Sequence, residues 1–383
     1  MESQIVISGF GMVTSLGGDA ASSCAAARAG ISRARELGII KVRREEDGKM
    51  EEVVGHSAAG LTDGFEADGR LIVLGWNALR DLLKPEIRDA IDWNRIACFV
   101  TFPNFERTRL GLALIQDGNI RKAKEGEQKE PQDARAHSAH ALALMKRVLK
   151  LADVPLPLER CFVNFGEHAA FIGAARAAID ALTKGQIDVA VVGAIDSLID
   201  SKVLSWLYQT GRLKCSDMPA GLQPGEGSGF LLLERSGTEK SRERPPIAVI
   251  TGIAEAIESR PLLQGEPATG RALAQTLSEL AAVSSVPAEK VCIVSDHNGE
   301  PYRAYDWGLA QNRLASKFPW VGEVPISYPI TSFGDTGAAC SAVATGTVLR
   351  AWQRGYARFS TAWVIAASED GPCATLGIGQ IAR

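Results

Sequence analysis

Two side chains that can exchange protons, Glu167 and His168, occupy a sharp corner of the sequence CFVNFGEHAAFIGAARAAIDAL. The corner follows an aromatic and β-branched run that begins at Cys161 and precedes an alanine-rich run of helical periodicity. A strand, a tight turn and a helix typically present one side chain at the helix N-terminus for covalent chemistry. No Cys or Ser stands on this corner, so the pattern indicates an active site without its usual nucleophile.

The elements expected around this corner are buried strands that alternate with helices. Strands are predicted near residues 4–10, 96–102, 160–165, 188–193, 228–234, 247–257, 290–295 and 363–367. Helical stretches between them favour an α/β fold with a parallel or mixed sheet. The segments QIVISGF and IAVITGI begin two similar halves, and a charged, proline-ended connection precedes the second. We expect an N-terminal half over residues 1–245 and a C-terminal half over 246–383.

Composition excludes several classes of protein. A net charge of -3 gives no basis for binding nucleic acid. The first residues lack the features of a signal peptide, and no apolar run approaches the about 20 residues that span a membrane. The seven cysteines are scattered without CxxC spacing, which predicts buried thiols in a reducing compartment. We therefore expect a cytoplasmic protein without membrane insertion, cofactor or metal site.

Two charged segments are predicted to be solvated loops on the surface. They are KVRREEDGKMEE, residues 41–52, and RKAKEGEQKEPQD, residues 121–133. The alternative interpretation is a docking surface for a partner.

Five motifs in the same order resemble those of β-ketoacyl synthases in the thiolase superfamily. They are ISGFGMVTSLGG near the N-terminus, the helix and strand from His168 to Asp196, GEGSGFLLLE, SDHNGEPYRAYDWG and SFGDTGAAC. The resemblance covers nearly the whole chain. It implies a thiolase-like fold, with two similar α/β halves in a five-layered α-β-α-β-α arrangement, and a dimer.

The resemblance also locates a changed catalytic triad. His168 stands where these enzymes carry the nucleophilic Cys, His297 at the first catalytic His, and Asp335 at the second. Glu167 adjoins this triad, and Glu369 is a further candidate member of the cluster. Asn298, Glu300 and Cys373 are the candidate substrate-binding residues. Cys373 falls near a glycine-rich loop of the family, and Arg303 is placed at a tunnel mouth.

These substitutions make ordinary decarboxylative condensation improbable. An acyl-imidazole at His168 would hydrolyse readily, and the positive end of the helix dipole disfavours imidazolium there. An ionised Asp335 would repel a developing oxyanion. One hypothesis is a degenerate, non-condensing partner, adaptor or acyl-binding subunit, which forms a homodimer or a heterodimer with a ketosynthase-like subunit. The other is an acyltransferase or thioester hydrolase that uses His168 and His297 with carboxylates on acyl carrier protein or coenzyme A thioesters.

Overall fold

The computed structural model describes residues 4–107, 111, 131–237 and 245–381, and within them ten strands form one mixed sheet. The eight predicted strands are confirmed, with shifted ends, and β10 and β12 are additional. The strands are β1 (Ile5–Thr14), β4 (Ile96–Pro103), β5 (Cys161–Gly166), β6 (Val189–Ser197), β7 (Glu226–Arg235), β8 (Ala248–Ile257), β9 (Val291–Ser295), β10 (Ile326–Ser327), β11 (Thr361–Ala367) and β12 (Pro372–Gln380).

The sheet repeats one strand order on each side of its centre. The first five strands lie in the order β5-β4-β6-β7-β1 and the other five in the order β10-β9-β11-β12-β8. The two sets meet where β1 pairs antiparallel with β8, at Val6–Val249 and Ile7–Ala248. This repetition supports the predicted division of the chain between residues 245 and 246, which remains a prediction.

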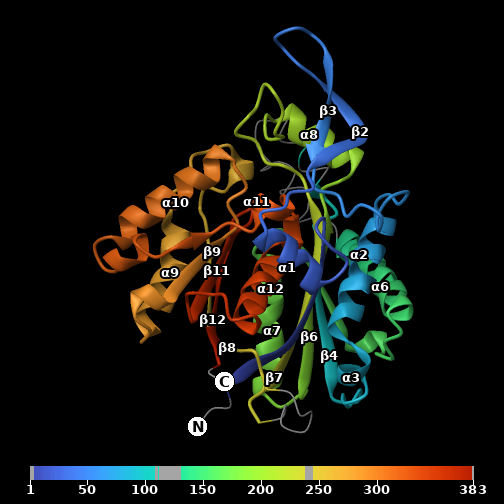
Figure 1. The fold of residues 1–383 in the computed structure, drawn as a ribbon, viewed down its shortest axis with the longest axis vertical. Helices are drawn as coiled ribbons and strands as arrows, with labels where there is room; N and C mark the ends of the chain where they lie inside the picture. The colour runs from blue at the N-terminus through green and yellow to red at the C-terminus, as the bar shows by residue number, and fades with distance from the viewer. Residues whose placement is uncertain (1–3, 108–110, 112–130, 238–244, 382–383) are drawn as a thin grey trace.

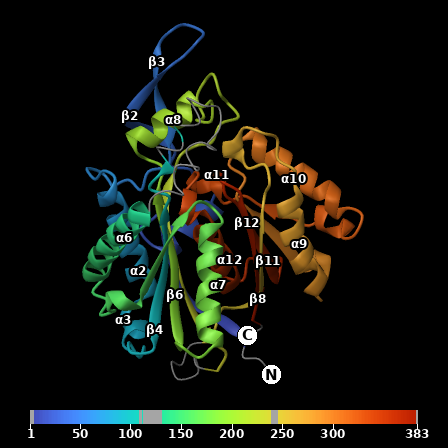
Figure 2. The ribbon, with the colours of Figure 1, turned by 180° about the vertical axis from the view of Figure 1, so that it is seen from behind.

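Helices cover both outer faces and fill the space between the two halves of the sheet (Figures 1 and 2). The helices are α1 (Ala20–Arg28), α2 (Asp68–Leu82), α3 (Pro85–Arg88), α6 (Pro131–Leu151), α7 (Ala170–Thr183), α8 (Ser201–Gln209), α9 (Arg271–Val283), α10 (Pro301–Leu314), α11 (Ile330–Phe333) and α12 (Cys340–Gln353). Helices α2 and α6 cover one outer face, α9 and α10 the other, and α7 and α12 lie in the middle. The predicted five-layered arrangement is confirmed. None of the described helices combines the length and the apolarity needed to cross a membrane.

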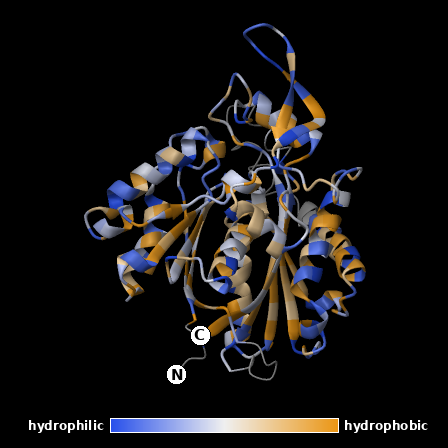
Figure 3. Ribbon diagram, viewed as in Figure 1, coloured by the Kyte–Doolittle hydropathy of each residue, from blue (hydrophilic) through white to orange (hydrophobic). Residues whose placement is uncertain are grey.

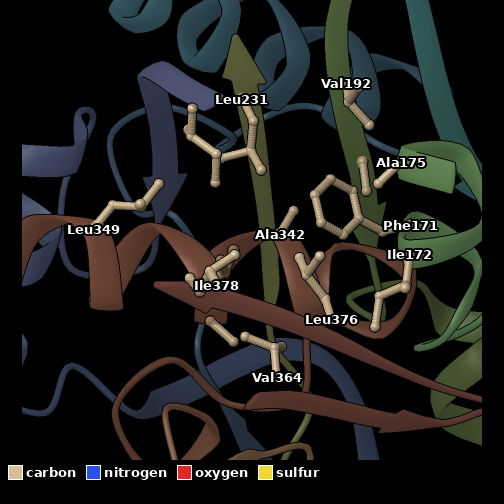
Figure 4. Close-up of a cluster of buried hydrophobic side chains, with 14 of the residues drawn as sticks. Phe171, Ile172, Ala175, Val192, Leu231, Ala342, Leu349, Val364, Leu376 and Ile378 are labelled. Atoms are coloured by element: carbon tan, nitrogen blue, oxygen red, sulfur yellow. The ribbon is translucent and has the colours of Figure 1, made fainter. Parts of the chain in front are cut away.

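The middle layer is held by a core that both halves share (Figure 4). Phe171 and Ile172 on α7 are fully buried, as are Leu349 on α12 and Leu376 on β12. Burying each such side chain contributes about 1.5–3 kcal/mol to stability. Small residues such as Ala342 let α12 approach β7 closely, since a Cβ at Gly229 would lie 3.1 Å from its Cβ. This packing fixes where the N-terminal ends of α7 and α12 lie.

The prediction of a surface loop over residues 41–52 is wrong. Those residues belong to a two-stranded arm of β2 (Arg35–Arg43) and β3 (Met50–Gly55), which projects from the body and carries a hydrophilic tip (Figures 1 and 3). Val42 and Val53 of the arm pack against residues of α8. Of the second predicted loop, residues 121–130 lie outside the described residues, and residues 131–133 begin α6.

Candidate active site

The first turns of α7 and α12 bring His168 and Asp335 together. His168 is two residues before α7, and its backbone carbonyl accepts a hydrogen bond from the Ser341 hydroxyl of α12 at 2.7 Å. The amide of Ala169 donates to the Ser368 hydroxyl at 3.1 Å, which ties the corner to the segment between β11 and β12. Asp335 follows α11, and one of its carboxylate oxygens accepts from the Gly337 amide at 2.8 Å. Both side chains are almost completely buried.

The His168 ring is engaged at both nitrogens. Nε2 lies 2.9 Å from Oδ1 of Asp335, and Nδ1 lies 3.1 Å from Nη2 of Arg303. A guanidinium only donates, so the neutral ring accepts from Arg303 at Nδ1 and donates its Nε2 proton to Asp335. Burial lowers the pKa of His168 and Arg303 lowers it further, but the charge and hydrogen bond of Asp335, together with the charge of Asp296, raise it, and the net direction is upward. This direction is opposite to the one expected from a helix dipole alone.

Asp335 is an ionised carboxylate in this network. Burial alone would raise its pKa, but the charge and hydrogen bond of His168 lower it, as do Arg303 and Asn298, and the net direction is well below the ordinary value. The Asn298 amide donates to Oδ2 of Asp335 at 2.7 Å and to Glu300 at 2.8 Å. Asn298 thus links the Asp335 carboxylate to a second acidic group.

A second buried cation, Arg212, neutralises two further carboxylates. Its Nε lies 2.6 Å from Oε1 of Glu300, and its Nη1 lies 2.9 Å from Oε2 of Glu369. The carboxylates face the guanidinium from different segments, so the arginine joins them like a clamp. Burial lowers the pKa of Arg212, but Glu300 and Glu369 raise it further, and the residue stays charged.

Arg303 lies inside the network, and its expected place at a tunnel mouth is corrected. Its Nη1 donates at 2.7 Å both to Oδ2 of Asp296 and to the carbonyl of Ala367. The sequence did not indicate Arg212 or Asp296 as site residues, and it placed Arg303 outside the network. Charge balance could have indicated the arginines. A buried cluster of Asp335, Glu300 and Glu369 needs more positive charge than one histidine supplies, so buried arginines are expected beside it.

In the described part of the chain, the side chain of His297 contacts side chains other than His168 and Asp335. Its Nδ1 contacts the Ser295 hydroxyl, and its ring makes edge contacts with Trp307 and Tyr328 at centroid distances of 6.1 and 5.8 Å. Burial lowers its pKa, and Asp296 does not compensate. Its Nε2 is buried without a hydrogen-bond partner among the described residues. Of the triad positions, only His168 and Asp335 are therefore in hydrogen-bond contact.

Glu167 and Cys373 lie on a different side of the corner, where they line a cavity of about 360 Å³. Burial and the charge of Glu369 raise the pKa of Glu167 well above its ordinary value, although Arg107 opposes this shift. Cys373 is the second residue of β12 and pairs with Ala256 of β8, so it belongs to a strand and not to a glycine-rich loop.

The cysteines near the corner are held as thiols. Burial raises the pKa of Cys373 and of Cys340 well above the ordinary value, and neighbouring carboxylates add to both shifts. The thiolate is the nucleophilic form of cysteine, so neither side chain is activated. Within the described part of the chain, no group of three or more His, Cys, Asp or Glu is placed to hold a metal ion.

No family model matches this chain, and neither does any curated protein. Solved structures do match it over its whole length. The complex of a type II polyketide synthase acyl carrier protein with its hexaketide-bound ketosynthase matches at a TM-score of 0.74 and 15% identity, covering 100% of both chains. The ishigamide ketosynthase/chain length factor matches at 0.69 and 19% identity, covering 99% of this chain and 100% of that chain. A ketosynthase in complex with its chain length factor from Xenorhabdus doucetiae matches at 0.69 and 17% identity, covering 99% and 98%.

These identities establish a shared fold and leave the chemistry to the site itself. The chain therefore has the thiolase-like fold found in ketosynthases and their chain length factor complexes.

Proposed function

We propose that this chain is a non-condensing, ketosynthase-like subunit that pairs with a ketosynthase-like partner. The observation that carries the proposal is the closed environment of His168, whose two ring nitrogens are held by Asp335 and Arg303. A neutral ring has no free lone pair in this arrangement, and a protonated ring has none at all. His168 is thus a buried structural link between two helix ends.

The charge of the site also opposes condensation. Decarboxylative condensation needs donors that stabilise a developing oxyanion. Here Asp335 is ionised and occupies the second catalytic His position that the sequence resemblance assigns to it. The buried thiols of Cys340 and Cys373 supply no thiolate to hold an acyl chain.

An open sheet edge supports pairing with another subunit. In the described part of the chain, β5 pairs with β4 and ends the sheet. Phe162 on this strand is 53% exposed and stacks on Phe99 at 5.0 Å. An exposed strand edge is a ready template for pairing with another chain. The similar structures described as ketosynthase and chain length factor complexes make a ketosynthase-like subunit the preferred partner, with an acyl carrier protein as a further one.

Co-purification tests the pairing. The tagged chain is co-expressed with the ketosynthases of its own organism, and we expect one of them to elute with it in a fixed ratio. Phe162→Glu should abolish that complex, whereas Phe65→Glu, which changes an exposed aromatic of another segment, should leave it intact. A chain that elutes alone with every candidate would contradict the proposal.

Thioester assays test the absence of condensing chemistry. The purified chain is incubated with acetyl and malonyl thioesters of coenzyme A and acyl carrier protein, and intact mass is recorded together with thiol release. We expect no acylated protein and no turnover. The acyltransferase or hydrolase hypothesis would require turnover that is lost in both His168→Ala and His297→Ala. The separation of His297 from the His168–Asp335 contact argues against it.

A further inference from the structure

The cavity beside the corner is lined by carboxyl groups and apolar side chains. Glu167, Glu255 and Asp370 line it together with Phe165 and Ile257. It lies between the first turn of α7 and strands β8 and β12, which run beside each other behind that helix (Figure 2). Its volume of about 360 Å³ is at the lower end of the range, roughly 300–1,000 Å³, of pockets that hold small molecules.

Glu167 is the side chain of this cavity that calls for a ligand. The residue is only 8% exposed, and no side chain of the described residues is hydrogen-bonded to its carboxyl group. Its oxygens are not among the fully buried atoms without a partner, so an ion, water or ligand in the cavity can reach them. Arg107, the nearest cation that acts on it, donates instead to Asp196 and the Ser197 carbonyl.

The lining contains no compensating positive charge. Among the described residues that line the cavity there is no Lys, Arg or His. Glu255 is paired at the surface with Arg176 at 2.5 Å, so that charge is already satisfied from outside. Glu167 is thus a carboxyl group of this partly apolar cavity that no cation of the lining contacts.

We propose that this cavity binds a small organic ammonium ion, with the ammonium group on the Glu167 carboxylate and an alkyl body against Phe165 and Ile257. A charge-assisted hydrogen bond of this kind is among the strongest that a carboxylate makes. The apolar walls favour an alkylamine over a metal ion, which would need several oxygen ligands at once. The proposal does not depend on the proposed subunit role, because binding is measured on the isolated chain.

Binding has a proton signature that identifies Glu167. Burial and Glu369 favour the protonated form of Glu167 in the empty cavity, and Asp196 and Asp370 add to this, whereas Arg107 opposes it. An arriving ammonium ion favours the carboxylate, so the carboxyl proton leaves to solvent as the ion pair forms. Association therefore releases up to one proton for each ligand.

Calorimetric titration tests the site with probes of equal length. Hexylamine, hexanol and hexanoate are titrated near neutral pH in phosphate and in a second buffer of different ionisation enthalpy. We expect hexylamine to bind at least about tenfold more tightly than either analogue, with an enthalpy that depends on the buffer. Glu167→Gln should weaken the affinity for hexylamine by about tenfold or more, and the binding enthalpy should no longer depend on the buffer. Glu266→Gln replaces an exposed carboxylate away from the cavity, and it should change neither the affinity for hexylamine nor the buffer dependence of the enthalpy.

A second variant tests the cavity without replacing a carboxylate. A Cβ at Gly173 would meet Oε1 of Glu255 at 3.4 Å, an ordinary contact, so Gly173→Leu should fold and fill part of the cavity. We expect it to lose hexylamine binding. Equal or tighter binding of hexanol or hexanoate would overturn the proposal in favour of a neutral or acyl ligand. It would also be overturned if folded wild-type protein fails to bind hexylamine, or if Glu167→Gln binds it unchanged.

Discussion

Nη2 of Arg303 lies 3.1 Å from Nδ1 of His168, on the side of the imidazole opposite its contact with Asp335. These residues come from the start of α10, the corner before α7 and the turn before α12. The imidazole therefore joins three elements of the two halves at one point. A site with this connectivity is expected to matter more for the stability of the chain than for turnover.

Asp335→Asn tests this interpretation. The substitution leaves His168 without its carboxylate in a fully buried environment, whereas Arg303 keeps its contact with Asp296, and breaking a buried pair typically costs about 3–5 kcal/mol. We expect the free energy of unfolding to fall by that order, as measured by urea denaturation. Asp89→Asn, at an exposed pair with Arg88, is the control and should change it by less than about 1 kcal/mol. A loss for Asp335→Asn no larger than that of the control would contradict the structural role.

Acid denaturation tests the ionisation of Asp335 by a second measurement. The pKa of Asp335 in the folded chain is below its unfolded value, so its stabilising contribution is present above the unfolded value of 3.8 and is lost as the pH falls below it. Asp335→Asn should therefore lose less stability than wild type over this acid range. A parallel pH dependence of the two proteins would show that folding does not lower the pKa of Asp335.

Arg212→Met should be strongly destabilising because it removes the cation that is hydrogen-bonded to both Glu300 and Glu369, and leaves Arg303 only at 4.0 Å from Glu300. Both carboxylates are buried, and the expected loss is again about 3–5 kcal/mol in the free energy of unfolding. The matched variant, Arg212→Met with Glu300→Gln and Glu369→Gln, removes both charges and should recover much of that loss. No recovery would indicate that Arg212 acts by packing, for example through its contact with the Trp206 ring at 5.3 Å.

The fold was predictable where local chemistry and packing agree. β-Branched runs indicated eight of the described strands, and most of these strands are buried, although β5 and β8 are largely half-buried. Strand β12 was missed since Gly377 and Gly379 interrupt its pattern, yet a Cβ at Gly377 would lie 2.6 Å from the Thr251 hydroxyl of β8. The arm of β2 and β3 was missed for the opposite reason. Its charges suggested a loop, but Lys41 and Glu52 form a cross-strand pair at 2.9 Å.

The site was predictable only in part. The positions of His168 and Asp335 came from motifs that resemble a known family, and the structure brings these two residues into contact. Arg303 is separated from His168 by 135 positions, and the segment around it carries no local pattern that specifies its partner. His297 followed the motif but faces Trp307, because side-chain direction depends on packing that a motif does not encode.

Cysteine labelling tests whether any thiol near the corner is activated. Six of the seven cysteines are buried and Cys215 is partly exposed. Burial raises the pKa of Cys24 to about 12, and those of Cys340 and Cys373 are also well above the ordinary value. We expect iodoacetamide to modify the native chain at Cys215 only and to modify all seven cysteines after unfolding, as read from intact mass. Rapid native labelling of Cys373 would reopen the possibility of thiol chemistry.

Glu167→Gln should stabilise the chain as the pH rises. Burial and Glu369 raise the pKa of Glu167 in the folded chain above its unfolded value of 4.5. A carboxyl group shifted in this direction costs nothing below the unfolded pKa, and it reduces stability as the pH rises from there toward the folded pKa. Glutamine cannot ionise, so the free energy of unfolding of the variant should rise relative to wild type by up to about 1.4 kcal/mol for each pH unit within that window. Urea unfolding in amine-free phosphate buffer across this range measures the difference. Glu266→Gln, at an exposed pair with Arg260, should follow wild type throughout, and a Glu167→Gln curve parallel to both would show that folding does not raise the pKa of Glu167.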